Sequence, residues 1–262
     1  MSKISEKLWV WGHLEGSHNG LTRLDCRMSP EEFADEYGIK NAFIVSYGGN
    51  IQPPFDSFAK RFSVLNEVKW SVLGDASTPI PDAELGNTQD VINALASGRN
   101  ITGGIVDDFF SPERMKRFPP EILKKMKRKL NDNGLDFWCV LYNHQLDSDL
   151  KKYIDCFDGV TFWVWGSQHI DNIEIYLEKL FALTKRKPVM LGVYLWDYFD
   201  DYSEPMDAGR FEKQVKLYFS MLERGKIDGI VFCSNTVGDA DLITNRVLKR
   251  YVAEYGNREI LK

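Results

Sequence analysis

The feature that most constrains the fold of this chain is a repeating unit, in which a short apolar run precedes an amphipathic helical segment. The unit recurs about eight times along the 262 residues. The apolar runs cover residues 8–12, 41–47, 68–74, 102–106, 135–142, 159–165, 189–196 and 229–233. The helical segments cover residues 29–37, 54–66, 87–97, 112–133, 147–157, 168–185, 206–224 and 239–255. Eight such units in roughly 250 residues are typical of a closed barrel, so we predict an α/β fold, a single (β/α)8 TIM barrel over residues 1–262.

An open doubly wound sheet is the main alternative for a chain that alternates strands and helices. Such a sheet usually carries a glycine-rich phosphate turn after an early strand. Residues 12–16, Gly-His-Leu-Glu-Gly, lack that fingerprint, and Gly48-Gly49 is followed by neither a third glycine nor a Walker lysine. The sequence therefore favours the barrel, and we expect no nucleotide and no other cofactor.

Charge and hydropathy argue against two classes of partner. The formal net charge is -5 and the pI is near 5.5, whereas a nucleic-acid surface needs clustered positive charge. The basic run 124–129 lies in a helical segment, where we expect a solvated outer face. No stretch reaches the roughly 20 apolar residues of a membrane span, and residues 1–6 have no signal-peptide core. We expect no nucleic-acid or membrane partner and a cytoplasmic location, or a periplasmic or secreted one if a signal peptide has been removed.

Two adjacent carboxylates end the fourth apolar run. Ile105 and Val106 precede Asp107 and Asp108, and a helix start follows at residues 111–113. Barrel enzymes place catalytic groups at the carboxyl ends of their strands, where a buried strand offers a charge little solvation. Because both preceding residues are apolar, the sequence does not decide which acid faces the mouth and which the helical shell or rim. A second catalytic carboxylate should therefore come from another strand end, and the candidates are Glu15, Asp75, Asp197, Asp200 and Asp201.

The alternation of side chains along the other strands indicates which of them face the barrel axis. In residues 189–196 one face is uniformly aliphatic and suits packing under helices, so the other face should look inward. The last members of each strand should meet at the C-terminal mouth of the barrel. The inward set comprises Trp9, Trp11, His13, Ser71, Leu73, Asp75, Trp138, Val140, Tyr142, His144, Thr161, Trp163, Trp165, Met190, Gly192, Tyr194 and Trp196.

Acids and aromatic rings at one mouth are typical of carbohydrate hydrolysis. One carboxyl group protonates the leaving oxygen and a second acts as nucleophile or base, while flat side chains stack on the apolar faces of sugars. We therefore expect a glycosidase that acts on a small-molecule carbohydrate, with Asp107 or Asp108 as one catalytic carboxylate. Its partner should be one of Asp197, Glu15 and Asp75. We expect Trp165 and Trp196 to stack on sugar rings. The predicted substrate-binding residues are Trp11, His13, Tyr47, Tyr142, Asn143, His144, Trp165, Tyr194, Trp196 and Asn235.

Two segments carry a resemblance to known proteins. The strand end Gly-Ile-Val-Asp-Asp-Phe-Phe at residues 104–110 and the segment 191–198, in this barrel-like order, resemble glycoside-hydrolase-type TIM-barrel proteins of environmental and gut bacteria. The resemblance covers most of the chain and implies a bacterial carbohydrate-active hydrolase of unassigned specificity. The sequence departs from the DxxDxDxE strand of chitinase-like barrels, and no Asn-Glu pair ends the fourth strand. The resemblance therefore implies no particular mechanism.

Two other functions remain open. In a metal-dependent amidohydrolase-type barrel, strands one, five and six supply histidine ligands. All four histidines of this chain lie at or just after those strands, and the ligands would be His13, His144 and His169, with His18 five residues after His13. Such a site would also need Asp107 or Asp108. Against it, the first strand lacks a His-x-His motif and the last strand ends in Ser234-Asn235 without an acid, so we assign no metal ligands. The third possibility is a non-catalytic barrel that binds a sugar without a second carboxylate.

Overall fold

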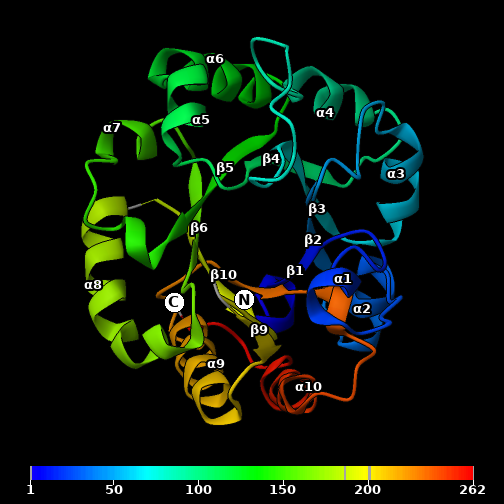
Figure 1. Ribbon diagram of the computed structural model, residues 1–262, viewed down its shortest axis with the longest axis vertical. Helices are drawn as coiled ribbons and strands as arrows, with labels where there is room; N and C mark the ends of the chain where they lie inside the picture. The colour runs from blue at the N-terminus through cyan, green and yellow to red at the C-terminus, as the bar shows by residue number, and fades with distance from the viewer. Residues whose placement is uncertain (1, 186, 200–201, 262) are drawn as a thin grey trace.

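The computed structural model describes residues 2–185, 187–199 and 202–261. Its parallel strands close into a barrel in the order β1-β10-β7-β6-β5-β4-β3-β2, and the helices form an outer ring around them (Figure 1). The predicted (β/α)8 TIM barrel is confirmed. The barrel strands are β1 Leu8–Gly12, β2 Asn41–Ile44, β3 Glu67–Leu73, β4 Ile101–Val106, β5 Asp136–Tyr142, β6 Gly159–Trp163, β7 Val189–Tyr194 and β10 Gly229–Cys233.

Some of the helices begin where the sequence supplies a capping side chain. The Ser29 hydroxyl accepts a hydrogen bond from the Glu32 amide at 3.1 Å, and the Glu32 carboxylate accepts one from the Ser29 amide at 2.8 Å. None of the helices in the described ranges is long and apolar enough to cross a membrane. The α-helices are α1 Asn19–Thr22, α2 Pro30–Glu36, α3 Asp56–Arg61, α4 Thr88–Ala94, α5 Pro112–Arg117, α6 Pro120–Asn131, α7 Lys151–Ile154, α8 Ile173–Thr184, α9 Ala208–Glu223 and α10 Ile243–Tyr255.

The helix predicted over residues 112–133 is two helices, α5 and α6. The break falls at Phe118 and Pro119, because prolines at positions 119 and 120 lack amide hydrogens and disfavour a helical residue before them. Pro120 then starts α6 at the first helical position, where a missing amide hydrogen costs little. Short 3-10 helices complete the chain: η1 Ile4–Lys7, η2 Phe62–Val64, η3 Asn143–Gln145, η4 Ser167–Asn172 and η5 Asn235–Val237.

The barrel interior is filled by large side chains in the alternation that the sequence predicts for β1, β5 and β6. Four tryptophans belong to this inner cluster, which is separate from the larger cluster between strands and helices. The prediction is wrong for Leu73, which packs in the outer cluster. A register shift between β3 and β4 at Ser71 and Leu73 interrupts the alternation there, so that Val72 and Leu73 both pack in the outer cluster. The inner cluster comprises Trp9, Trp11, Phe43, Val45, Ile105, Trp138, Val140, Trp163, Met190, Val231 and Cys233.

One cation, Lys69 of β3, enters this apolar interior. Its ammonium lies 5.4 Å from the Trp9 ring centroid and 5.1 Å from that of Trp138. It donates to both carboxylate oxygens of Asp136 at 2.7 Å, at the start of β5. The ion pair therefore lies at the N-terminal end of the barrel, away from the mouth.

Strand β7 ends at Tyr194, two residues earlier than predicted. The chain then forms an antiparallel hairpin of β8 Trp196–Phe199 and β9 Tyr202–Pro205. Trp196 therefore does not continue the inward face of β7. Its ring is 4% exposed, packs in the outer cluster, and its indole nitrogen donates to the Ser203 hydroxyl at 2.8 Å. The predicted stacking of Trp196 on a sugar is contradicted by this burial.

Candidate active site

The inner position of Ile105 decides which of the two adjacent acids faces the axis. Ile105 belongs to the inner cluster and Val106 to the outer one, so Asp107 continues the inward face of β4. Asp107 is 4% exposed, and its Oδ1 accepts a hydrogen bond from the Asp108 amide at 2.8 Å. Burial, followed by the charges of Asp108 and Asp75, raises the pKa of Asp107 well above its usual range. These surroundings therefore favour the protonated form of the Asp107 carboxyl group.

Asp108 leaves the strand and turns onto the rim. Its φ is 43°, in the left-handed region that a non-glycine residue rarely adopts. Its Oδ2 accepts from the Ala76 amide at 2.9 Å and its Oδ1 from the Tyr142 hydroxyl at 2.7 Å. Both carboxyl oxygens of Asp108 thus accept a hydrogen bond. The contacts fix Asp108 between the loop after β3 and the end of β5.

A third carboxylate, Asp75, follows β3. Its oxygens accept hydrogen bonds from the Ser77 hydroxyl at 2.5 Å, the Thr78 hydroxyl at 2.6 Å and the Gly48 amide at 3.2 Å. Asp75 is 9% exposed, and its charge acts on both Asp107 and His18. Of the proposed partner acids that lie within the described residues, Asp75 is the one that the structure places beside the β4 pair.

The buried guanidinium of Arg114 in α5 holds these loops together. It donates to the carbonyl oxygens of Gly74 at 2.6 Å, Asp107 at 2.7 Å and Thr78 at 3.4 Å, and also to that of Asp75. Arg114 is 5% exposed and all of these acceptors are backbone oxygens. Its charge lowers the pKa of Asp107, but less than burial and the neighbouring acids raise it. Arg114 therefore shapes the acid cluster without forming an ion pair with it.

A pocket of about 390 Å³ opens beside Asp108 at the mouth. Its volume is in the range of small-molecule sites. The ring of His144 stacks on that of Tyr142, with centroids 5.5 Å apart and an interplanar angle of 9°, and Trp165 meets Tyr142 edge-on at 5.9 Å. The structure thus brings four predicted site residues to one cavity. The lining includes Asp108, Phe110, Ser111, Tyr142, His144 and Trp165.

Aromatic rings continue from this pocket around the mouth. Tyr194 lies 5.7 Å from Trp165 and 6.0 Å from Tyr198, measured between ring centroids. Tyr198 in turn lies 5.5 Å from His18, which lies 4.6 Å from Tyr47. These rings form an aromatic arc at or just after the ends of β5, β6, β7, β1 and β2. The acids follow the ends of β3 and β4. His18 and Tyr198 were not among the predicted substrate-binding residues; the position of His18 shortly after β1 was the available signal.

Two buried imidazoles belong to this arc. The rings of His13 and His18 are 4.5 Å apart, and His18 Nδ1 lies 2.9 Å from the Thr236 hydroxyl. Burial lowers the pKa of His18 to about 4 although the charge of Asp75 opposes the change. Burial and the neighbouring His18 also lower the pKa of His13. Both rings are therefore neutral near pH 7.

The histidines do not assemble into the metal centre that one alternative requires. His144 stacks on Tyr142, whereas His13 packs against His18 and His169 lies 6.0 Å from the ring of Phe199. Within residues 2–185, 187–199 and 202–261, no group of three or more His, Cys, Asp or Glu side chains is arranged to hold a metal ion. The amidohydrolase-type ligand set is therefore not formed by the described residues.

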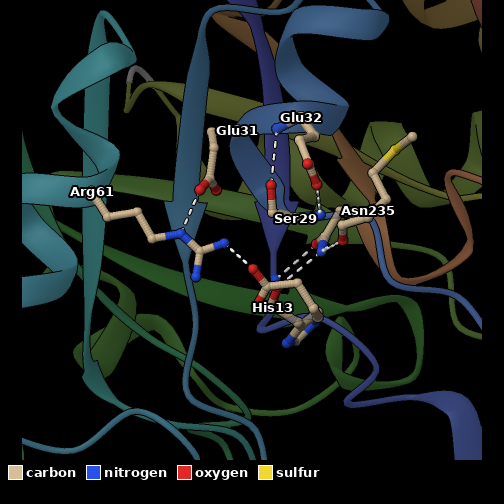
Figure 2. Close-up of polar contacts among 8 residues, drawn as sticks. His13, Ser29, Glu31, Glu32, Arg61 and Asn235 are labelled. Carbon is tan, nitrogen blue, oxygen red and sulfur yellow. Dashed lines mark hydrogen bonds and ion pairs between the residues drawn. The ribbon is translucent and has the colours of Figure 1, made fainter.

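The side chain of Asn235 is directed toward the backbone of His13 (Figure 2). Its Oδ1 accepts from the His13 amide at 2.9 Å, and its Nδ2 donates to the carbonyl oxygens of His13 at 2.9 Å and Met28 at 2.7 Å. Its side chain is fully buried. The prediction that Asn235 binds a sugar hydroxyl is therefore wrong, because its polar atoms are used by backbone groups.

Two of the acids proposed as catalytic partners are also engaged elsewhere. Arg61 pairs with Glu15 and with Glu31 of α2 (Figure 2 shows the Arg61–Glu31 contact). The Asp197 carboxylate is 3% exposed and accepts from the Ser167 amide at 3.2 Å. Both therefore have structural partners that compete with a catalytic role. Asp200 and Asp201 lie outside the described residues.

The remaining predicted residues lie near the mouth at different depths. Trp11 is 5% exposed and meets Trp163 edge-on at 5.2 Å inside the barrel, so it is a core residue. Asn143 is largely buried, and its Oδ1 accepts from the Trp165 amide at 2.8 Å. Asn143 thereby positions the Trp165 backbone. Tyr47 and Tyr194 are half-buried members of the aromatic arc.

Comparison with known proteins identifies relatives by fold alone. No protein-family model matches the chain, and no curated protein matches it in sequence. The catalytic domain of a hyperthermophilic chitinase from Pyrococcus furiosus matches with a TM-score of 0.62 and 12% identity over 96% of each chain. A GH128 endo-beta-1,3-glucanase from Amycolatopsis mediterranei, in complex with laminarihexaose, matches with a TM-score of 0.58 and 9% identity. The match covers 94% of this chain and 99% of the glucanase chain. The spore cortex-lytic enzyme SleL from Bacillus megaterium matches with a TM-score of 0.59 and 15% identity. The match covers 100% of this chain and 76% of the SleL chain.

Proposed function

We propose that this protein is a glycoside hydrolase and that Asp107 and Asp108 are its catalytic carboxyl groups. The observation that carries the proposal is the contrast between two adjacent acids. Asp107 is buried with a raised pKa, whereas Asp108 accepts hydrogen bonds at both oxygens and lines the mouth pocket. Titratable pairs whose environments favour opposite protonation states mark acid and base roles. The similar folds of a chitinase and a glucanase support the same class of reaction.

In this proposal Asp107 gives its proton to the leaving oxygen of the glycosidic bond. Asp108 faces the anomeric carbon as a carboxylate and stabilises the positive charge that develops on the sugar. The Tyr142 hydroxyl holds Asp108 in position, since it donates to Oδ1 at 2.7 Å. Asp75, beside the pair, keeps the local potential negative and so favours the protonated form of Asp107.

The choice of leaving group separates the two roles. Dinitrophenyl glycosides need little protonation because the phenolate leaves readily, whereas oligosaccharides and methyl glycosides need an acid. We expect Asp107→Asn to lose activity on oligosaccharides but to keep much of it on dinitrophenyl glycosides. Asp108→Asn should lose activity on both classes. The panel should include β-1,3-glucan and chitin fragments, which the names of the structural relatives suggest.

Asp132→Asn provides a matched control, because Asp132 is exposed at the end of α6, which precedes β5 and so lies at the opposite end of the barrel. It should cleave every substrate as the wild type does. Equal activity of wild type, Asp107→Asn and Asp108→Asn would exclude these carboxylates from catalysis. Binding without cleavage by the wild type would instead support the sugar-binding barrel.

A further inference from the structure

The pocket beside Asp108 combines aromatic walls with a carboxylate. Phe110, Tyr142, His144 and Trp165 supply rings, and Asp108 supplies the charge. No Lys or Arg belongs to the lining of this pocket in the part of the chain that the structure describes. Phe, Tyr and Trp rings beside an acid can recognise an ammonium group, through the negative faces of these rings and the carboxylate together.

We propose that this pocket selects an amino sugar whose 2-amino group is free and protonated, with the ammonium held beside Asp108 among the rings. The inference rests on the proposed glycoside hydrolase function and names its substrate class. A neutral sugar could use the same rings for stacking but would leave the carboxylate without a cation. An acidic sugar would bring a second negative charge to Asp108.

The surrounding charges act in the same direction. Asp75 lies close to the two acids that follow β4, and its charge acts on Asp107. The neighbouring cation, Arg114, donates to four backbone carbonyl oxygens and is 5% exposed, so it is not available to an incoming anion. An ammonium at the pocket would offset the negative potential of the acids, whereas a carboxylate or sulfate on the sugar would add to it.

Three trisaccharides with the same β-1,4 backbone test the proposal, because they differ only at C2. They are the glucosamine, N-acetylglucosamine and glucose trimers, titrated calorimetrically into the full-length Asp107→Asn variant, which should bind without cleaving. We expect the glucosamine trimer to bind at least tenfold more tightly at pH 6. This advantage should shrink as pH rises through about 8, where an amine of this kind loses its proton.

Two variants locate the selectivity. Adding Asp108→Asn to the titrated protein should remove most of the preference for the amine, whereas adding Asp132→Asn should leave it unchanged. Equal or tighter binding of the acetylated or neutral trimer would overturn the proposal, as would failure of the glucosamine trimer to bind or an advantage that survives in Asp108→Asn. If the wild type cleaved acetylated or neutral glycans without preferring the amine, the amino-sugar proposal would fail and the hydrolase function would still be supported. Absence of cleavage of any glycan would count against that function separately.

Discussion

Replacing Asp107 with asparagine should stabilise the protein near neutral pH while it impairs the proposed catalysis. Because burial, Asp108 and Asp75 raise the pKa of Asp107, the folded protein keeps a proton that the unfolded chain releases. The difference in pKa stabilises the folded protein fully at pH values below the pKa of Asp107 in the unfolded chain. This contribution is lost as the pH rises toward the pKa of Asp107 in the folded protein. The loss is about 1.4 kcal/mol per pH unit above about 3.9, and it continues until the pH reaches the pKa of Asp107 in the folded protein. Asparagine cannot ionise, and its oxygen can still accept from the Asp108 amide.

Urea denaturation of wild type, Asp107→Asn and Asp132→Asn at pH 4, 5, 6 and 7 measures this effect. The free energy of unfolding of Asp107→Asn, relative to wild type, should increase from pH 4 upward with the slope given above and then level off. Asp132 is exposed, so the difference between Asp132→Asn and wild type should stay nearly flat. A constant difference between Asp107→Asn and wild type over the whole range would refute the reasoning. It would mean that Asp107 ionises as readily in the folded protein as in the unfolded chain.

Three other substitutions test the site and the barrel interior. Tyr142→Phe removes the hydroxyl that donates to Asp108, and since hydrogen bonds to charged groups contribute about 1.5–3 kcal/mol, kcat/KM should fall roughly 10- to 100-fold with an unchanged circular dichroism spectrum. Asp136→Asn leaves the Lys69 ammonium buried without its counter-charge and should lower the free energy of unfolding by about 3–5 kcal/mol, whereas Lys69→Met should cost clearly less because Asp136 is partly exposed. Gly192→Ala should destabilise by at least about 1–3 kcal/mol in the same urea assay, since its Cβ would lie 2.1 Å from the Trp163 ring.

The order of strands and helices could be predicted because each barrel strand is a short apolar run and several helices carry their own start signals. Ser29 with Glu32 and Ser111 with Pro112 mark two such starts, and both helices begin there in the structure. Strand ends were harder to place. At Tyr194 the chain leaves the barrel for a hairpin, and the hydrophobic residues of that hairpin look the same in sequence as a longer strand.

The candidate site was predicted in part for a similar reason. Alternation along β5 and β6 correctly placed Tyr142 and Trp165, because an uninterrupted strand fixes the direction of its side chains. Alternation carries no information on hydrogen-bond partners. It could not reveal that Asn235 is used by backbone groups or that Arg61 pairs with Glu15. The face of β4 likewise depended on packing against neighbouring strands, which adjacent apolar residues do not encode.

Arg114 bears on how this mouth can be redesigned. Its guanidinium joins the carbonyl oxygens of residues 74, 75, 78 and 107, so two successive loops share one anchor. A loop grafted alone would present carbonyl groups that no longer meet the guanidinium, leaving a buried charge unsatisfied. The segments 74–78 and 107–114 therefore form a single exchangeable module, and transplanting them together with Arg114 preserves the acids at the rim.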